Sequence, residues 1–260
     1  LDELTLRLRP RGPWEAMDLG AALLRANWKP VLISWLALVL PVVAVIYALG
    51  PAPSAWVWAI VWWLKPLFAR VPLYVLSRSV FGAPPRLHEV IRALPALLRT
   101  GVFSGLTYLR FDPWRSFNMP VRVLEGLRGP AAGARGQLLR RRAGGHAFWL
   151  TFVCAAFVVV LSLALLGLVN MFTPDPSGNA DNEKSLWELI KRGEENTPLW
   201  LYYLNAALDF IAFSVIELLY VASGFTLYLN RRMVLEGWDI EVALRALAAR
   251  VAAQQEKQSW

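Results

Sequence analysis

Four long apolar stretches, separated by shorter polar segments, dominate the pattern of this 260-residue chain. The first is uncharged over 19 residues and would extend about 28 Å as a helix, which matches the hydrocarbon thickness of a bilayer. The stretches are Val31–Leu49, Ala55 to about Leu76, Ala147–Phe172 and Leu199–Leu229. They predict an all-α fold, a polytopic helical membrane bundle with four transmembrane spans and additional amphipathic interfacial helices.

The polar segments between the spans give the expected domain organisation. The turn sequence at 50–54 lets the chain re-enter the membrane at once, so spans one and two form a hairpin. We expect an amphipathic N-terminal helix at 1–30, the hairpin at 31–76, a large loop at 77–146, span three at 147–172, a second loop at 173–198, span four at 199–229 and a C-terminal helix at 230–260.

Charge fixes the expected orientation. The loop at 77–146 carries twelve arginines against three acids, a net charge of +9, whereas the loop at 173–198 has six acids against three cations, a net charge of −3. Because cationic loops stay in the cytoplasm, the first loop and both termini are predicted to be cytoplasmic. This concentration of the +8 net charge in one loop indicates contact with anionic lipid headgroups and argues against nucleic acid binding.

The basic loop is not uniformly polar. Leu87–Leu109 is largely apolar but is interrupted by Pro95 and Gly101, which favours a pair of short interfacial or re-entrant helices; a fifth and sixth crossing is the alternative. Arg128–Gly145 is interpreted as a flexible basic connector. Within it, Arg140, Arg141 and Arg142 act as the stop signal that flanks span three, with lipid phosphates as additional partners.

Four charges fall inside the predicted spans, and their depths suggest how they pair. Lys65 lies nine residues after Trp56 and Asp209 lies nine after Trp200, each about 13 Å from the outer edge. Arg70 and Glu217 lie deeper, at about 21 and 25 Å. An unpaired charge at the centre of a bilayer costs at least about 2.5 to 3.5 kcal/mol. We therefore predict Lys65 beside Asp209, Arg70 beside Glu217, and spans two and four in contact.

Three roles for these charges remain open. The first is structural: Arg70 extends to the inner interface and one buried pair fixes the helix register. The second is a pathway for protons or ions. The third is a cavity or a subunit interface lined by charges. Pro66 adds a further expectation, because it removes a backbone N–H and leaves a carbonyl for which a cation is a natural partner.

Candidate chemistry elsewhere in the chain is sparse. One cysteine, Cys154, and two histidines, His88 and His146, cannot form the usual zinc or haem ligand patterns, so no metal or cofactor is expected. The chain has no phosphate-binding glycine loop, no nucleophile elbow and no pair of histidines at helical spacing. An enzyme is therefore disfavoured, and no catalytic residue is predicted.

Two segments carry a resemblance to a known group. The sequence YLNRRMVLEGWDIEVALRAL at Tyr228–Leu247 resembles the closing segment of a broad group of bacterial multi-pass membrane proteins, which includes the membrane domain of some glycerophosphodiester phosphodiesterases. PWEAMDLGAALLRANWKPVL at Pro13–Leu32 resembles the opening helix of the same group. LKPLFARVPLYVLSRSVFG at Leu64–Gly82 is similar to a subset encoded beside MoxR-type AAA ATPases and transglutaminase-like membrane proteins. The charged and broken middle of the chain departs from the six-span layout of the group.

The resemblance implies a role for the closing segment and a class of partner. Its matching residues would lock the terminal helix beneath the bundle, with acids near the start of that helix and arginines at the headgroups. These residues are Arg231, Arg232, Glu236, Asp239 and Glu241. The expected function is a non-enzymatic subunit that scaffolds or anchors a bacterial envelope complex with membrane or AAA-ATPase-associated protein partners. A transporter or proton-coupled conduit that uses the intramembrane charges is the alternative.

Overall fold

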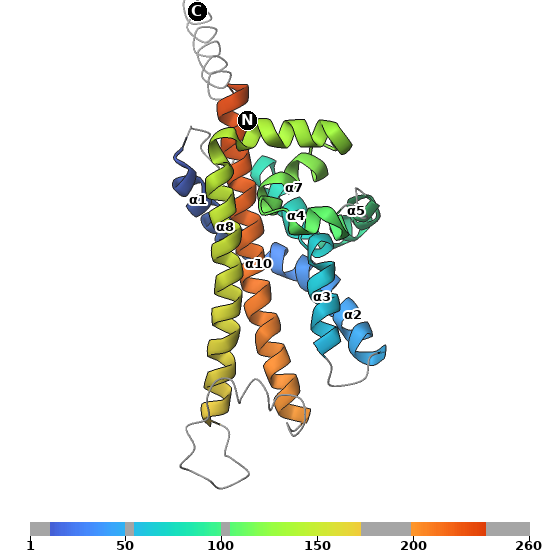
Figure 1. Cartoon of the computed structure of the whole chain (residues 1–260). Helices are drawn as coiled ribbons and strands as arrows, with labels where there is room; N and C mark the ends of the chain where they lie inside the picture. Colours follow the sequence, from blue (N-terminus) through green and yellow to red (C-terminus); the bar gives the residue numbers. More distant parts are fainter. Residues whose placement is uncertain (1–10, 50–54, 100–104, 173–198, 238–260) are drawn as a thin grey trace, which may run out of the picture.

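A computed structural model describes residues 11–49, 55–99, 105–172 and 199–237, and every regular element within these ranges is a helix (Figure 1). In chain order they are α1 (Pro13–Ala26), α2 (Trp28–Leu49), α3 (Ala55–Phe68), α4 (Arg70–Phe81), α5 (Leu87–Arg99), the 3-10 turn η1 (Tyr108–Phe111), α7 (Arg115–Val123), α8 (Gly129–Phe172) and α10 (Leu199–Glu236). The predicted all-α fold is confirmed. The segments at 173–198 and 238–260, for which an acidic loop and a C-terminal helix are expected, lie outside the described residues.

Four stretches of helix are long and apolar enough to cross a membrane, as the sequence predicts. They are Trp28–Ala48, Ala59–Phe81, Gly129–Val169 and Tyr203–Glu236. The second stretch combines α3 and α4, which are separated at Ala69, three residues after Pro66. By contrast, α5 has 13 residues and extends about 20 Å, less than the hydrocarbon thickness.

The helices α8 and α10 form the long antiparallel axis of the molecule (Figure 1). Thr151 contacts Tyr220, and Ser162 contacts Asp209; in both pairs the residue numbers add to 371, which gives the register of the two helices. One end of this axis, where α8 begins and α10 ends, is called the basic end because Arg135, Arg140–Arg142 and Arg231–Arg232 lie there. The opposite end, where α8 ends and α10 begins, is called the loop end.

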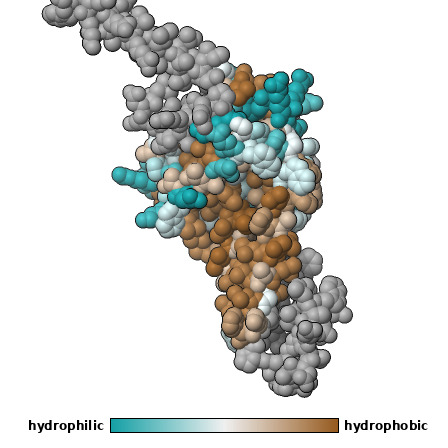
Figure 2. Space-filling model, turned by 90° about the vertical axis from the view of Figure 1, so that its left-hand side faces the viewer, coloured by the Kyte–Doolittle hydropathy of each residue, from teal (hydrophilic) through white to brown (hydrophobic). Residues whose placement is uncertain are grey.

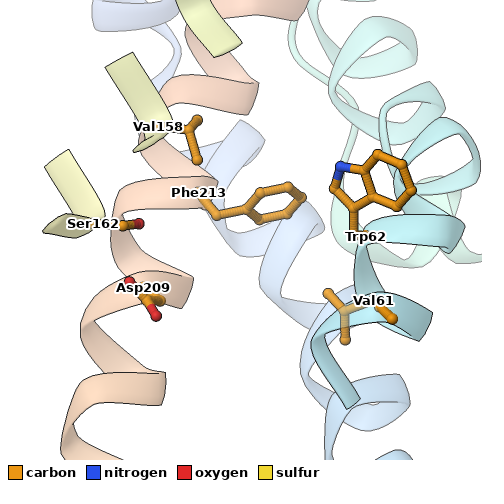
Figure 3. A pocket seen from close by; sticks show the side chains of 7 residues that line it. Val61, Trp62, Val158, Ser162, Asp209 and Phe213 are labelled. Carbon is orange, nitrogen blue, oxygen red and sulfur yellow. The ribbon is translucent and has the colours of Figure 1, made fainter. Parts of the chain in front are cut away.

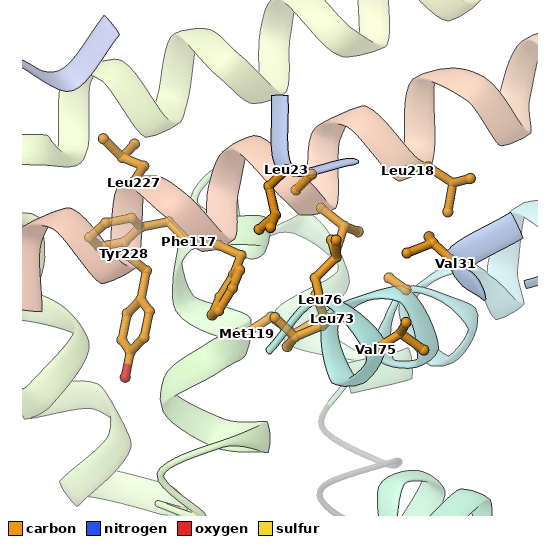
Figure 4. Packing of buried hydrophobic residues seen from close by; sticks show 14 of the residues in the cluster. Leu23, Val31, Leu73, Val75, Leu76, Phe117, Met119, Leu218, Leu227 and Tyr228 are labelled. Atoms are coloured by element: carbon orange, nitrogen blue, oxygen red, sulfur yellow. The ribbon is translucent and has the colours of Figure 1, made fainter. Parts of the chain in front are cut away.

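Most of the buried core lies toward the basic end. Every residue of α10 from Tyr220 to Leu229 is buried, and α1, α4 and α7 pack around this segment. Figure 4 shows Leu73 and Leu76 of α4 facing Phe117 and Met119 of α7 in this cluster. We call α1, α4, α5, α7 and the first part of α8, together with the α10 segment they surround, the platform.

Two glycines let helices approach α10 more closely than any side chain would allow. A Cβ added to Gly20 of α1 would lie 2.5 Å from Cα of Ser223, and one added to Gly224 would lie 2.8 Å from the backbone carbon of Ser116 in α7. The hydroxyl of Ser223 also donates a hydrogen bond to the Met17 carbonyl, at 3.1 Å. The predicted N-terminal amphipathic helix is thus packed on α10 by its small residues.

The interpretation of Arg128–Gly145 as a flexible connector is wrong, because α8 begins at Gly129 and is helical throughout. Its first part lies across the basic end before the helix turns along the axis (Figure 1). The physical reason is a stripe of small and apolar residues at helical spacing, all of them buried: Ala132, Gly136, Leu139, Ala143 and Ala147. The arginines between them obscured this stripe in the sequence.

Surface hydropathy divides the molecule into two zones. Figure 2 shows an apolar zone toward the loop end and hydrophilic residues gathered toward the basic end. The apolar zone includes large exposed side chains of α8 and α10, such as Phe157, Val160 and Ile211. Lipid tails are the natural neighbours of this zone, and the platform lies at or beyond one edge of it.

Candidate functional site: the charged groups of the bundle

The carboxylate of Glu217 in α10 is contacted by two cations. Its side chain is 0% exposed. Lys65 of α3 places Nζ 2.6 Å from one carboxylate oxygen, and Arg115, the first residue of α7, places Nη2 3.7 Å from the other. The Lys65 contact is a close ion pair without the alignment of a hydrogen bond. Three helices therefore meet at one acid, which supplies the counter-charge for two cations that a membrane would otherwise exclude.

Aromatic rings complete the surroundings of Lys65. Its Nζ lies 5.1 Å from the ring centroid of Phe213 and 5.8 Å from that of Tyr220. The Tyr220 hydroxyl is itself held by the Thr151 hydroxyl of α8, at 3.0 Å. The cluster around Glu217 thus links α3, α7, α8 and α10, and the ring faces add to the stabilisation of the ammonium group.

Both predicted charge pairs are wrong: Lys65 is not paired with Asp209, and Arg70 is not paired with Glu217. The prediction assumed that spans two and four start at the same depth. In the structure α3 begins closer to the basic end than α10 does (Figure 1), so equal counts along the two helices do not reach equal levels. Lys65 consequently reaches Glu217. The predicted contact between spans two and four is present, since α4 packs on α10.

The carbonyl that Pro66 leaves without a partner is occupied by a cation, as the sequence predicts. In a regular helix the N–H at position 66 would bond to the Trp62 carbonyl, and proline has no N–H. Arg110 of η1 donates from Nη2 to the Trp62 carbonyl and from Nη1 to the Trp63 carbonyl, each at 2.8 Å. Its guanidinium carbon also lies 3.5 Å from the ring centroid of Trp62.

The sequence analysis did not identify Arg110 as this partner. It lies in the broken segment after α5, where nothing in the local pattern points to α3. Burial lowers the pKa of its guanidinium, and the neighbouring charge of Arg115 lowers the pKa further. Arg110 and Arg115 thus come from segments outside the regular spans, and Arg70, described next, contacts such a segment.

Arg70 stabilises the end of a helix. It is buried at the start of α4, and its Nη1 donates to the carbonyls of Leu97 at 2.7 Å and Leu98 at 3.3 Å. These carbonyls belong to the last turn of α5, where backbone acceptors lack helical partners and the helix dipole favours a cation. Arg70 thereby ties the short helix α5 to the second span.

Asp209 lies apart from the cluster around Glu217, in a cavity of about 340 Å³. Figure 3 shows the cavity between α3 on one side and α8 and α10 on the other. Ser162 of α8 donates a hydrogen bond to the Asp209 carboxylate. Of the described residues, no lysine or arginine lies within 4 Å of this carboxylate. The lining residues are Ala59, Val61, Trp62, Val158, Ser162, Asp209 and Phe213.

A second charge network lies at the basic end and includes part of the predicted closing signature. Glu125, in the turn after α7, accepts hydrogen bonds from Arg135 at 3.1 and 3.3 Å and from the Tyr228 hydroxyl at 2.5 Å. Arg135 also bonds to Glu236, which accepts a 2.8 Å bond from Arg232. The network links the C-terminal end of α10 and the first turns of α8 to the turn between α7 and α8.

The other predicted residues of this end have separate positions. Arg231 is half-buried, and Asp239 and Glu241 lie outside the described residues. Arg140 stacks on Trp114, with its guanidinium carbon 4.7 Å from the ring centroid. Arg141 and Arg142 are exposed. The three consecutive arginines therefore differ, since one packs on an aromatic ring and two face outward.

Comparison with known proteins does not assign the chain. No protein family model, curated protein or solved structure matches it. The function must therefore be argued from the geometry. Lys65, Arg70, Arg110 and Arg115 each contact an acid or a backbone carbonyl that the fold itself provides, whereas Asp209 faces a cavity.

Proposed function

We propose that the protein is a non-enzymatic membrane subunit that scaffolds or anchors a bacterial envelope complex at the inner membrane. The observation that carries the proposal is the platform, in which α1, α5 and α7 pack closely around those parts of the membrane-crossing stretches that lie toward the basic end. Its α10 segment is continuously buried from Tyr220 to Leu229, and the Glu125–Arg135–Glu236 network closes its outer edge. A rigid surface fixed to the membrane suits the docking of other proteins.

The use of the intramembrane cations supports this proposal over a conduit for ions. Arg70 and Arg110 bind carbonyls at a helix end and at a proline-broken turn, and Lys65 and Arg115 share one acid. Charges that hold helices together in this way are structural elements of the bundle. They also join the platform to the membrane helices, so that a partner bound to the platform would be held at a fixed position on the membrane.

Orientation and partners follow from the charge pattern. The excess of arginine at the basic end supports a cytoplasmic platform and cytoplasmic termini by the positive-inside rule. Exposed Arg141 and Arg142 are suited to the anionic headgroups of the inner leaflet. The resemblance of Leu64–Gly82 to proteins encoded beside MoxR-type ATPases supports a partner associated with an AAA ATPase.

Native mass spectrometry of the tagged full chain, extracted with a mild detergent, tests the proposal. We expect a partner protein at a fixed stoichiometry. Ile91→Glu, at an exposed apolar position of the platform helix α5, should remove that partner without changing the melting temperature. Arg25→Glu, at an exposed position of α1, serves as the matched control and should retain the partner. A wild-type chain that is homogeneous and free of partners would overturn the scaffold function.

The alternative function, a transporter or proton-coupled conduit, is favoured by one observation. Asp209 presents a carboxylate to an apolar cavity within the membrane zone, away from the cations of the Glu217 cluster. Intramembrane ionisable residues of this kind mark substrate pathways in many membrane proteins. Flux lost in Asp209→Asn while the partner complex stays intact would favour transport over anchoring.

A further inference from the structure

The cavity that contains Asp209 lies near the centre of the membrane. Asp209 is nine residues after Trp200, or about 13 Å along α10, and Ser162 is thirteen residues after Trp149, or about 20 Å along α8. Trp149 and Trp200 are both exposed, and tryptophans at such positions mark the two interfaces of a membrane. The sum of these two distances is close to the hydrocarbon thickness of a bilayer, so the cavity lies well away from both headgroup layers.

The cavity has the size and lining of a small-molecule site. Its volume of about 340 Å³ falls within the range of ligand pockets. Six of the seven lining residues are uncharged, and the Trp62 side chain at its edge is 51% exposed, so the cavity opens toward the surrounding lipid. A molecule dissolved in the membrane could enter from the side between α3 and α8.

The charge of the lining favours one class of occupant. Asp209 is the one ionisable residue among those that line the cavity. Of the lining residues, Ser162 is the one whose hydroxyl donates a hydrogen bond to the Asp209 carboxylate. Lys65 is close to Phe213, but its ammonium group is held by Glu217 at 2.6 Å. A carboxylate in apolar surroundings is stabilised most by a counter-charge, and the ligand is the group that can bring one.

The aromatic residues of the cavity point to the same class. Figure 3 shows the Phe213 ring extending from α10 toward α3, across from Trp62. Aromatic faces attract cations electrostatically, and the attraction strengthens where water is excluded. Both rings already contact a protein cation: Arg110 lies over the Trp62 ring and Lys65 lies over the Phe213 ring. The fold thus already uses these two rings in cation–π contacts.

We propose that the cavity between α3, α8 and α10 binds a lipophilic cation, with the carboxylate of Asp209 as its counter-ion and Trp62 and Phe213 as its aromatic walls. The apolar body of such a molecule would fill the uncharged part of the cavity. Its positive charge would lie beside Asp209, with Ser162 holding the carboxylate in place. This site is distinct from the platform, so its occupation and partner docking are separable properties.

A matched pair of ions tests the proposal. Tetraphenylphosphonium and tetraphenylborate have nearly the same size and shape and opposite charges. Binding of each to the purified full chain in lipid nanodiscs is measured by equilibrium dialysis, with empty nanodiscs to subtract partitioning into lipid. We expect saturable binding of tetraphenylphosphonium and none of tetraphenylborate. Asp209→Asn should weaken the cation at least tenfold, whereas Asp209→Glu should retain most of the affinity.

A second variant guards against misfolding of the first. Val158→Trp keeps the carboxylate and fills the cavity, so it should also abolish binding, and the melting temperature reports whether each variant is folded. Equal binding of the two ions, or an unchanged affinity in both Asp209→Asn and Val158→Trp, would overturn the proposal and leave a cavity filled by an acyl chain only. Because the readout is binding, its result is independent of whether partner proteins co-purify.

Discussion

The two long helices of the axis use the membrane in opposite ways. Within the membrane-crossing stretch of α10, 72% of the residues in an apolar segment of 18 are buried, whereas in the corresponding segment of α8 the share is 6%. Yet α8 is the more apolar of the two. Its apolar face is left to the lipid, and the less apolar helix lies at the centre of the bundle.

This difference has a physical cause. Lipid tails are as apolar as leucine, so an apolar side chain gains little by moving from lipid into a membrane protein, whereas small and polar groups gain close packing and hydrogen bonds. The buried polar residues of α10 are Ser214, Glu217, Ser223 and Thr226. In this protein, the polar content of a span therefore identifies the central helix better than its hydrophobicity does.

The largest effect should come from Glu217→Gln in α10. It leaves Lys65 and Arg115 without a counter-charge in a buried site, so the free energy of unfolding should fall by about 3 to 5 kcal/mol. Lys65→Met should cost less, because Arg115 remains to pair with Glu217. Chemical unfolding in detergent, followed by circular dichroism, measures both. Unchanged stability of Glu217→Gln would show that α10 does not depend on this cluster.

A smaller effect is expected from a single methyl group. Gly224→Ala forces α7 away from α10, where Ser116 lies in the path of the new Cβ, and should lower the stability by about 1 to 3 kcal/mol. Gly167→Ala in α8 is the matched control, since nothing lies within 4 Å of its Cβ position. The control should be neutral or slightly stabilising. An equal loss of stability in the two variants would contradict the conclusion that α10 is closely packed while α8 faces lipid.

Truncation of one valine on each helix sharpens the comparison further. Val221→Ala opens a cavity in a position that is 0% exposed and should cost about 1 kcal/mol of packing. Val160→Ala removes the same atoms from a side chain that is 63% exposed and should change the stability by less than about 0.5 kcal/mol. A large loss for Val160→Ala in the membrane, absent in detergent, would show that another protein covers this face of α8.

Among the substitutions that break a buried contact, the smallest effect is expected at the hydrogen bond between the two helices. Thr151→Val removes the hydroxyl that contacts Tyr220 and also donates to the Pro113 carbonyl. Such bonds within membranes contribute about 0.6 kcal/mol on average, so the loss in unfolding free energy should be close to this value. Thr151→Ser keeps the hydroxyl and should unfold like the wild type. A loss above that of Glu217→Gln would reverse the proposed order of contributions.

The spans could be predicted from the sequence because a long apolar run without charges has few alternatives to a membrane helix. A cation as the hydrogen-bond partner of the Trp62 carbonyl could be predicted, since Pro66 removes the usual backbone donor, but the residue that supplies it could not. The pairing of Lys65 could not, because it depends on the level at which α3 starts relative to α10. That level is set by packing between distant segments and leaves no mark in the local pattern.

The helical first part of α8 is a different case, because its signal was present. Ala132, Leu139 and Ala143 recur at helical spacing, but the glycines and arginines between them suggested a mobile linker. Tertiary contacts overrode the weak helix propensity of glycine. The roles of Arg110 and Arg115 were invisible for another reason, since each depends on a loop segment that folds back onto a span.

The bond between Arg110 and the Trp62 carbonyl joins positions 48 residues apart in the chain. A ribosome therefore delivers the second span to the membrane well before it delivers the arginine that completes its broken turn. Until then the open carbonyl must be met by water or by the insertion machinery, because hydrocarbon offers no donor. The second span reaches its final form only after the chain that follows it has been synthesised and has folded back.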